Sequence, residues 1–520
     1  MASTLLSPGV EIQERDLTIG SIETVEVNVG AIAGAFQKGP VLKPVRIASE
    51  SQLIETFGEP NDKNADEWWV AASFLQYGGV LDVVRCSTTG QLTASDDNVT
   101  SPYTLSIPTL EHYEANEYFT TNNPFKWAAR NPGVQGNAIK VAIIDKGADV
   151  TLTLDSALTT TTVGTQVSTA SGSPNGAKSG FIYQWDAASN KVSLITSDTW
   201  VATDVIENGV TDAVVSAKSD WYDSQVAYGN VNWASIAPRP GTSPYVAERG
   251  GANDEMHIVV YDSTGAITGK PNSLLEKFIY VSKANDAKTS SGAVNYYPTV
   301  ILNTSQYVYW GCHENDAYDV SGNAAISSAA NFGGTDNAGN PSTTTFDLFS
   351  SDVANRTYTF VKGAEVGSAT AGQVITALNE FADTETVDID YLLMGGGAIA
   401  TKSDHQQVAA KVLSVASGRK DCVGFISPYY SDVVGVTSSA TQTQNVIDFY
   451  EGMQATSFGV FDSGWKYIYD RFADKYRYVP LNGDVAGLCA AVTANGTPWF
   501  SPAGLNRGAI RGAVKLAFSP

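Results

Sequence analysis

The chain has 520 residues, of which 43% are apolar and 10% aromatic, so it can form packed cores and is not a disordered protein. Its 54 Asp and Glu against 32 Lys and Arg give a formal net charge of −22. This balance argues against binding of DNA, RNA or an anionic membrane by the chain as a whole, since these partners need an excess of cations. At about 150 residues per domain, the length predicts three or four folding units.

The cysteines and the N-terminus indicate a protein that is made in a cytosol. The four cysteines are far apart and form no CxxC pair, which argues against a disulfide framework and a zinc site. The first ten residues lack the basic and apolar regions of a signal peptide, and no stretch reaches the ~18 apolar residues of a membrane span. We therefore expect a chain without membrane insertion and with four free thiols, Cys86, Cys312, Cys422 and Cys489.

Residues 1–29 are predicted to form an extended arm. VEIQE, which starts at Val10, and ETVEVNVG, which ends at Gly30, alternate apolar and polar side chains as strands do. Two strands this short cannot bury a core and need an existing sheet to join. Val10 and Ile12 lie on one side of the first strand, so we expect them to enter a sheet of a neighbouring subunit by strand addition.

Residues 30–87 and 370–520 show the pattern of an α/β fold. The first part contains a buried strand, a short helix between Ser49 and Gly58, an apolar helix that closes at Gly78, and the strand VLDVVRCS. The second part contains a helix, a strand, a helix ended by Gly418 and another strand, which predicts a parallel βαβ unit. Because the two parts share this character, we expect one discontinuous α/β core, interrupted by an insertion.

The end of the chain is predicted to form a hairpin, a helix of small residues and a last helix from Leu505 to Phe518. In such a helix Arg507, Arg511 and Lys515 recur every four residues and form a basic stripe beside an apolar packing face. The packing face would contain Ile510, Ala513, Val514 and Ala517. The stripe is either a solvated helix face or a docking surface for an acidic partner.

Residues 88–369 form the predicted β-rich insertion, with short alternating runs between turn residues. Examples of these runs are AIKVAIID, GFIYQW, KVSLIT and HIVVYD. Residues 159–180 are close to low complexity, so we expect a mobile excursion there.

The sequence contains no catalytic constellation. None of the four His has a second ligand at metal-binding spacing, and Cys312 and His313 are adjacent, which points their side chains apart in a strand. No GxSxG, GxGxxG or P-loop motif is present. An acidic run could suggest a cation site or a glycosidase pair, but it flanks a helix end and a strand start: Asp383, Glu385, Asp388 and Asp390. We therefore expect no enzyme activity, cofactor or metal.

An alternative function rests on aromatic residues in the β-rich insertion. If exposed, these rings would stack on sugars, as in a glycan-binding or glycan-degrading virion protein, whereas in most β domains they belong to the core. They are Trp185, Trp200, Trp221, Tyr222 and Trp233.

Seven stretches of the chain resemble contractile bacteriophage tail sheath proteins, in the order of that family. They are LLSPGVEIQERD, GAIAGAFQKGPVLKPVRIASESQLIETFGEP, FLQYGGVLDVVR, WAARNPGVQGNAIKVAI, FADTETVDIDYLLMGGG, RYVPLNGDVAGLCA and PWFSPAGLNRGAI. Residues from about 146 to 249 match nothing in the family, whose corresponding region is variable and faces outward. Members of the family continue past the SPAG stretch into a further domain, so the resemblance implies that the C-terminal part is truncated here.

The resemblance implies a structural subunit that polymerises as stacked hexameric rings around a tail tube. Such a sheath contracts and drives the tube through the host envelope, and arms of neighbouring subunits complete a shared sheet. The expected partners are copies of the chain, the tail tube, and baseplate and tail terminator proteins, in a virion tail assembled in the host cytoplasm. An acidic partner of the basic stripe would be the tail tube or the next ring. The alternatives are the glycan function and the sheath of a bacterial secretion or bacteriocin apparatus.

Overall fold

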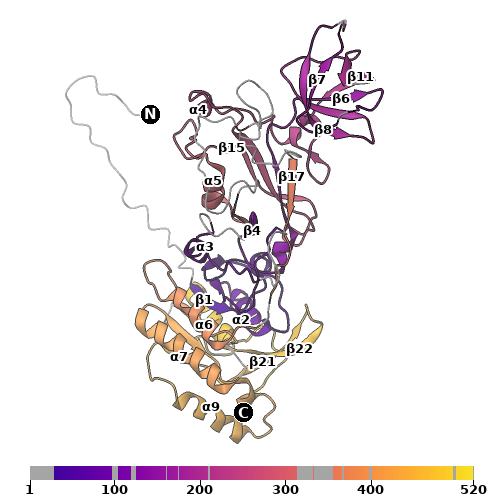
Figure 1. The fold of residues 1–520 in the computed structure, drawn as a ribbon. Coiled ribbons are helices and arrows are strands. Elements are labelled where there is room, and N and C mark those ends of the chain that lie inside the picture. The colour runs from indigo at the N-terminus through magenta and orange to yellow at the C-terminus, as the bar shows by residue number, and fades with distance from the viewer. Residues whose placement is uncertain are drawn as a thin grey trace, which may run out of the picture. The chain divides into compact units, whose positions relative to one another are not determined.

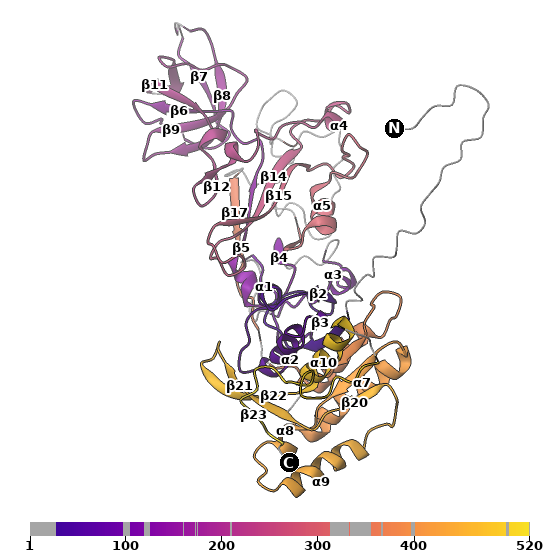
Figure 2. The same cartoon turned by 180° about the vertical axis from the view of Figure 1, so that it is seen from behind.

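In the computed structural model the chain forms two compact units (Figures 1 and 2). The α/β unit contains the described residues up to Phe36, Lys43–Cys86 and those from Ser368 on, and the β-rich unit contains Gln37–Leu42 and Ser87–Gly367. The structure describes residues 28–96, 104–118, 125–159, 161–171, 173, 175–208, 211–312, 332, 355–365, 368–396, 401–495 and 499–518. The predicted arm residues Val10 and Ile12 lie outside these ranges.

The α/β unit is built on a six-stranded sheet in which five strands are parallel. The strand β1 lies between β3 and β18, so segments far apart in sequence share one sheet. Their apolar runs are typical of parallel strands that are covered on both faces. β2 is antiparallel and lies at one edge. The order is β2 (Val45–Ile47), β3 (Val80–Arg85), β1 (Val29–Gly34), β18 (Tyr391–Leu393), β19 (Val423–Ile426) and β20 (Gly459–Phe461).

Helices cover both faces of this sheet (Figure 1). Gly30 of β1 lies against Phe74 of α2 (Ala65–Leu75), whereas Gly424 of β19 lies against Val412 of α7 (Lys402–Arg419). The registers place Gly30 and Gly424 on opposite faces, so the unit has three layers. α10 (Asn482–Asn495) packs against α2, and α6 (Ala371–Leu378) packs against α7. The remaining helices are α1 (Glu50–Phe57), η4 (Asn379–Phe381), α8 (Tyr430–Val433) and α9 (Ser439–Glu451).

Most of the predicted helix boundaries are confirmed. The Ser49 side chain accepts a hydrogen bond from Gln52 N at the start of α1, and Gly58 with φ 86° ends that helix. The helix α7 continues past the predicted Gly418 and ends at Arg419, and the C-cap residue Lys420 takes the left-handed conformation with φ 66°. The predicted parallel βαβ unit is present as β18, α7 and β19.

The predicted last helix from Leu505 to Phe518 is wrong. This segment is irregular except for the short strand β23 (Lys515–Leu516). Gly512, inside the predicted helix, has φ 69°, and Gly504, just before it, has φ 113°; an α-helix does not allow the value at Gly512. The glycines that recur every four residues therefore favour an irregular backbone, although the spacing of the basic residues suggests a helix.

The β-rich unit contains a four-stranded antiparallel sheet, in the order β15 (Ser273–Ser282), β14 (Glu255–Asp262), β5 (Ile139–Ile144) and β17 (Asn355–Thr359). Two further short strand pairs are β16 (Val308–Trp310) with β4 (Trp127–Ala129), and β12 (Val226–Tyr228) with β13 (Val231–Asn232). Its helices are α3 (Leu110–Ala115), η1 (Val134–Ala138), η2 (Tyr222–Ser224), η3 (Trp233–Ser235), α4 (Pro244–Ala247) and α5 (Tyr297–Thr304).

The same unit contains a closed six-stranded barrel with an apolar interior that includes Leu152, Val192 and Trp200. β7 lies within residues 159–180, so the expected mobile excursion is wrong and this stretch supplies a barrel strand. Closure explains this, because β7 hydrogen-bonds on both sides, to β8 and to β10. The strands are β6 (Val150–Leu154), β7 (Gln166–Thr169), β8 (Ser179–Asp186), β9 (Lys191–Ile195), β10 (Val205–Asn208) and β11 (Thr211–Asp220).

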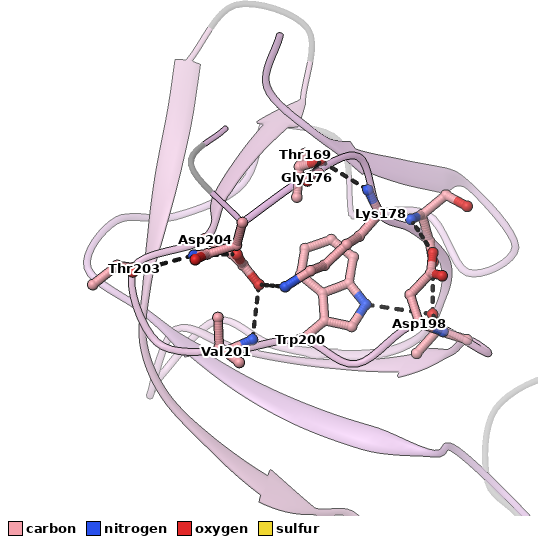
Figure 3. A network of polar contacts seen from close by, with 11 residues as sticks. Thr169, Gly176, Lys178, Asp198, Trp200, Val201, Thr203 and Asp204 are labelled. Carbon is pink, nitrogen blue, oxygen red and sulfur yellow. Dashed lines mark hydrogen bonds and ion pairs between the residues drawn. The ribbon is translucent and has the colours of Figure 1, made fainter. Parts of the chain in front are cut away.

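A buried ion pair lies in the loops of the barrel (Figure 3). Lys178 Nζ donates to Asp204 Oδ2 at 2.7 Å, and Asp204 also accepts from Val201 N and from the Asn175 side chain. Burial alone would raise the pKa of Asp204, but Lys178 and these hydrogen bonds hold it below the ordinary value. The polar stretch that contains Asn175 and Lys178 is therefore tied to the barrel.

The aromatic residues of the glycan hypothesis belong to cores. Trp200, Trp221, Tyr222 and Trp233 are at most 3% exposed. Trp185 is half-buried and packs against the barrel core. These rings form no exposed stacking surface for sugars.

Candidate interaction site

The hairpin near the C-terminus carries an aromatic outer face. β21 (Trp465–Asp470) and β22 (Lys475–Pro480) pair so that Tyr467 lies opposite Tyr478, and Tyr469 opposite Tyr476. The period of two places these four rings on one face. Tyr467 and Tyr478 have ring centroids 4.7 Å apart, and Tyr469 and Tyr476 are about half exposed. Aromatic cross-strand pairs stabilise such a face.

The inner face of the hairpin is anchored by a buried ion pair. Lys466 Nζ donates to Asp484 Oδ1 at 2.9 Å and to Ser73 Oγ at 2.9 Å. Burial raises the pKa of Asp484, although Lys466 opposes that shift. Ile468, two residues after Lys466, packs into the core of the α/β unit. The face of the hairpin opposite the tyrosines is therefore fixed to α2 and α10.

The C-terminal segment, residues 499–518, joins this hairpin through its backbone (Figure 2). β23 pairs with β21, and Val514 N donates to Tyr467 O at 2.8 Å. Arg511 N donates to the Tyr77 hydroxyl at 2.9 Å, and this hydroxyl donates to Asp484 Oδ1 at 3.0 Å. These hydrogen bonds link the segment to the ion pair of Lys466 and Asp484.

The structure does not align Arg507, Arg511 and Lys515 in one helical stripe. Each cation instead lies over a different aromatic ring. Lys515 Nζ is 5.0 Å from the Tyr467 ring centroid. The Arg511 guanidinium is 4.9 Å from the Tyr77 ring and donates to Gln76 O, whereas Arg507 is 5.7 Å from the Phe500 ring. All three side chains are exposed.

The predicted packing face of the last helix is also wrong, since Val514 is 62% exposed. Sequence reasoning further missed the exposed apolar side chains of the segment, above all Leu505 at 102% and Trp499 at 78%. The available signal was the glycine and proline content of SPAGLNRGAIRGA, which favours an irregular chain over a helix.

Ion pairs hold the tip of the hairpin beside the α1–α2 region. Arg471 pairs with Glu50, and Asp62 pairs with both Lys475 and Arg477. The pair of Lys475 and Asp62 is exposed, so it contributes little stability.

The histidines singled out in the sequence have structural roles. His257 Nδ1 accepts from Tyr280 N at 3.0 Å, and its Nε2 lies 2.8 Å from Pro238 O. His405 Nε2 lies 3.0 Å from Ser427 O, and burial lowers the pKa of His405 to about 4. Both side chains are fully buried. His313 lies outside the described residues, and His112 lies on α3, where its carbonyl accepts a hydrogen bond from the side chain of the C-cap residue Asn116.

The acidic run near residue 385 is bound into turns. Asp383 accepts hydrogen bonds from Glu385 N and from the Thr386 hydroxyl, which hold its pKa below the ordinary value. Asp390 accepts from Val29 N. Within the described ranges no group of three or more His, Cys, Asp or Glu is arranged to hold a metal ion.

The cysteines of the described residues are unpaired with one another. Burial raises the pKa of Cys86, Cys422 and Cys489, which favours the protonated thiol over the nucleophilic thiolate. None of the helices that the structure describes has the length and apolar character needed to cross a membrane.

Comparisons with known proteins give a consistent result. Residues 367–519 match the family model of the phage tail sheath protein central domain. The tail sheath protein of Enterobacteria phage T4 is 27% identical, in an alignment that covers 99% of this chain and 77% of that protein. The tail sheath proteins of Vibrio phage KVP40 and Salmonella phage ViI are each 26% identical, with 99% of this chain covered and 78% and 74% of those proteins.

Two solved structures are also similar. They are the sheath tail proteins of Listeria innocua, with a TM-score of 0.40 at 9% identity, and of Desulfitobacterium hafniense, with a TM-score of 0.33 at 9% identity. The alignments cover 94% and 98% of this chain, and 61% and 67% of those chains. Since both TM-scores are below 0.5, the assignment rests on the sequence matches. The chain is similar to phage tail sheath proteins over 99% of its length, and its residues 367–519 match the family model of their central domain.

Proposed function

We propose that this chain is a structural subunit of a contractile tail sheath, which polymerises with its own copies as stacked hexameric rings around a tail tube. The observation that carries the proposal is the similarity to three tail sheath proteins, each aligned over 99% of the chain. Contraction of the rings drives the tube through the host envelope. The subunit then belongs to the virion tail, is assembled in the host cytoplasm, and contacts tube, baseplate and tail terminator proteins.

The proposed assembly assigns different tasks to the parts of the chain. Residues 30–87 and 370–520 form the sheath core, and residues 88–369 are an insertion whose portion at about 146–249 faces outward. The N-terminal arm joins the sheet of a neighbouring subunit with Val10 and Ile12. The aromatic hairpin and the C-terminal segment support a role of the core in assembly, because they leave exposed apolar and cationic side chains on an open sheet.

The proposal assigns no enzyme activity to the chain. His257 and His405, the two buried histidines of the described residues, are held by backbone groups, and Asp383 is engaged in a turn. The glycan alternative is not favoured, because four of its five aromatic residues are at most 3% exposed.

Electron microscopy tests the proposed function directly. The full chain, produced together with the tail tube protein, is expected to form long hollow tubes or cogwheel-like polymers. A chain that stays dispersed in the presence of assembled tail tubes would contradict the proposal. A saturable hydrolysis of glycan that is lost on one carboxylate substitution would instead support the alternative.

A further inference from the structure

The C-terminal segment carries the three most exposed large apolar side chains of the described residues. They are Leu505 at 102%, Trp499 at 78% and Val514 at 62%, and the neighbouring Phe500 is 50% exposed. Single exposed apolar residues are common on proteins, whereas several gathered in one segment mark an interaction surface. We define the C-terminal surface as Trp499, Phe500, Leu505 and Arg507.

The structure holds this segment in a defined place. Arg511 N is fixed by the Tyr77 hydroxyl at 2.9 Å, and the α9 residue Gln442 donates to Ala517 O at 3.1 Å. The Arg507 guanidinium lies over the Phe500 ring, so a cation is placed beside one of these apolar side chains. Exposed apolar side chains and a guanidinium in one segment fit a partner that offers both apolar area and carboxylates.

The charge of the segment differs from that of the chain. Residues 499–518 contain Arg507, Arg511 and Lys515 and no Asp or Glu, whereas the chain as a whole carries −22. Within the described part of the chain these three cations form no ion pair. A second copy of the same acidic chain is therefore a complementary partner.

The α/β unit also offers a matching acidic segment. Residues 380–390 carry five carboxylates and no cation: Glu380, Asp383, Glu385, Asp388 and Asp390. Asp383, Glu385 and Asp388 are exposed, and hydrogen bonds hold the pKa of Asp383 below its ordinary value, so it is ionised at neutral pH. Its turn fixes the carboxylate through Glu385 N and Thr386.

We infer that the C-terminal surface docks on the acidic segment 380–390 of a second copy of this chain. This inference rests on the proposed function, since it assigns one of the contacts by which the subunits polymerise. The apolar side chains supply the affinity by burial, and the charges select the partner surface and its orientation.

The first test removes the apolar contact in the full chain. The double variant Trp499→Ser and Leu505→Asp is expected to raise the protein concentration needed for polymerisation by about tenfold or more, as measured by sedimentation and electron microscopy. The matched control is Val294→Asp, which changes an exposed apolar residue of the β-rich unit that is 50% exposed, and it should polymerise normally. Circular dichroism establishes that both variants are folded.

The second test exchanges the charges. Arg507→Glu should weaken polymerisation several-fold, most strongly at low salt, and Asp383→Lys should do the same. The chain with both substitutions should recover at least part of the loss. An acidic tail tube as the partner predicts no recovery, and that result overturns the inference.

The two proposals fail in different ways. If the wild-type chain forms tubes and the Trp499→Ser, Leu505→Asp variant forms them at the same concentration, the docking surface is wrong and the sheath function stands. If the wild-type chain stays monomeric throughout, with tail tubes present, both proposals are wrong.

Discussion

The C-terminal sheet of the α/β unit and the barrel of the β-rich unit expose their strand edges differently. All six barrel strands pair on both sides, so closure leaves no edge for another chain. In the three-stranded sheet, β22 and the short β23 are edge strands within the described ranges, beside exposed tyrosines and the C-terminal surface. The comparison indicates that the barrel is self-sufficient, whereas the C-terminal sheet is open to partners.

The largest effect is expected from breaking the buried ion pair below the open sheet. Lys466→Met leaves Asp484 buried without its cation and should cost the α/β unit about 3–5 kcal/mol of unfolding free energy. Hydrogen exchange of β21 and α10 amides measures this loss, while amides of the β-rich unit should be unchanged. The control Lys475→Met removes an exposed pair and should cost about 0–1 kcal/mol. Equal losses in the two variants would contradict the role of burial.

The corresponding change in the barrel should have a smaller effect. Lys178→Met leaves Asp204 with hydrogen bonds from Val201 N and Asn175, so the loss should be about 2–3 kcal/mol. It should appear in the exchange of barrel amides alone. A loss spread over the α/β unit would show that the two units are coupled.

The two units should also differ in pH dependence. Burial raises the pKa of Glu67 in α2 to about 8, so the folded state keeps a proton that the unfolded state loses above its ordinary pKa of 4.5. The stability that depends on this proton is lost as the pH rises from about 4.5 to 8. Glu67→Gln should therefore stabilise the α/β unit by about 2 kcal/mol more at pH 9 than at pH 5, by denaturant titration.

The barrel should respond at the opposite end of the pH scale. The lowered pKa of Asp204 means that its contribution is present above the ordinary value of 3.8 and is lost as the pH falls through the folded value. Asp204→Asn is the matched comparison for Glu67→Gln. In this variant the hydrogen-exchange protection of the barrel amides should depend less on pH in the acid range. An acid response that persists in this variant would assign it to other groups, such as His257, whose pKa burial lowers.

The smallest effect is expected at the attachment of the C-terminal segment. Tyr77→Phe removes the hydroxyl that links Arg511 N to Asp484 and should cost about 1 kcal/mol locally. The Arg511 amide should exchange about fivefold faster, with little change in the central sheet. Tyr476→Phe, which removes a hydroxyl from the exposed face, is the control and should leave this amide unchanged.

Much of the fold could be predicted because local signals agree with the packing. Ser49 and Gly58 bound α1 as their capping chemistry predicts, and the apolar runs of β1 and β3 form a parallel sheet. Barrel closure could not be predicted, since residues 159–180 are polar and carry no strong strand pattern. Their order depends on pairing of β7 with β8 and β10, which is a non-local property.

The amino-acid sequence by itself determined the acidic charge, the α/β pattern on both sides of the β-rich region, and the resemblance to tail sheath proteins. It also supplied Arg507, Arg511 and Lys515, but a spacing of four residues suggested a helix that does not exist. Only the tertiary structure decided their places, because Gly504 and Gly512 take conformations outside the helix and β21 supplies backbone partners for β23. Residue spacing indicates a shared face only where the backbone is regular, and that regularity depends on contacts distant in sequence.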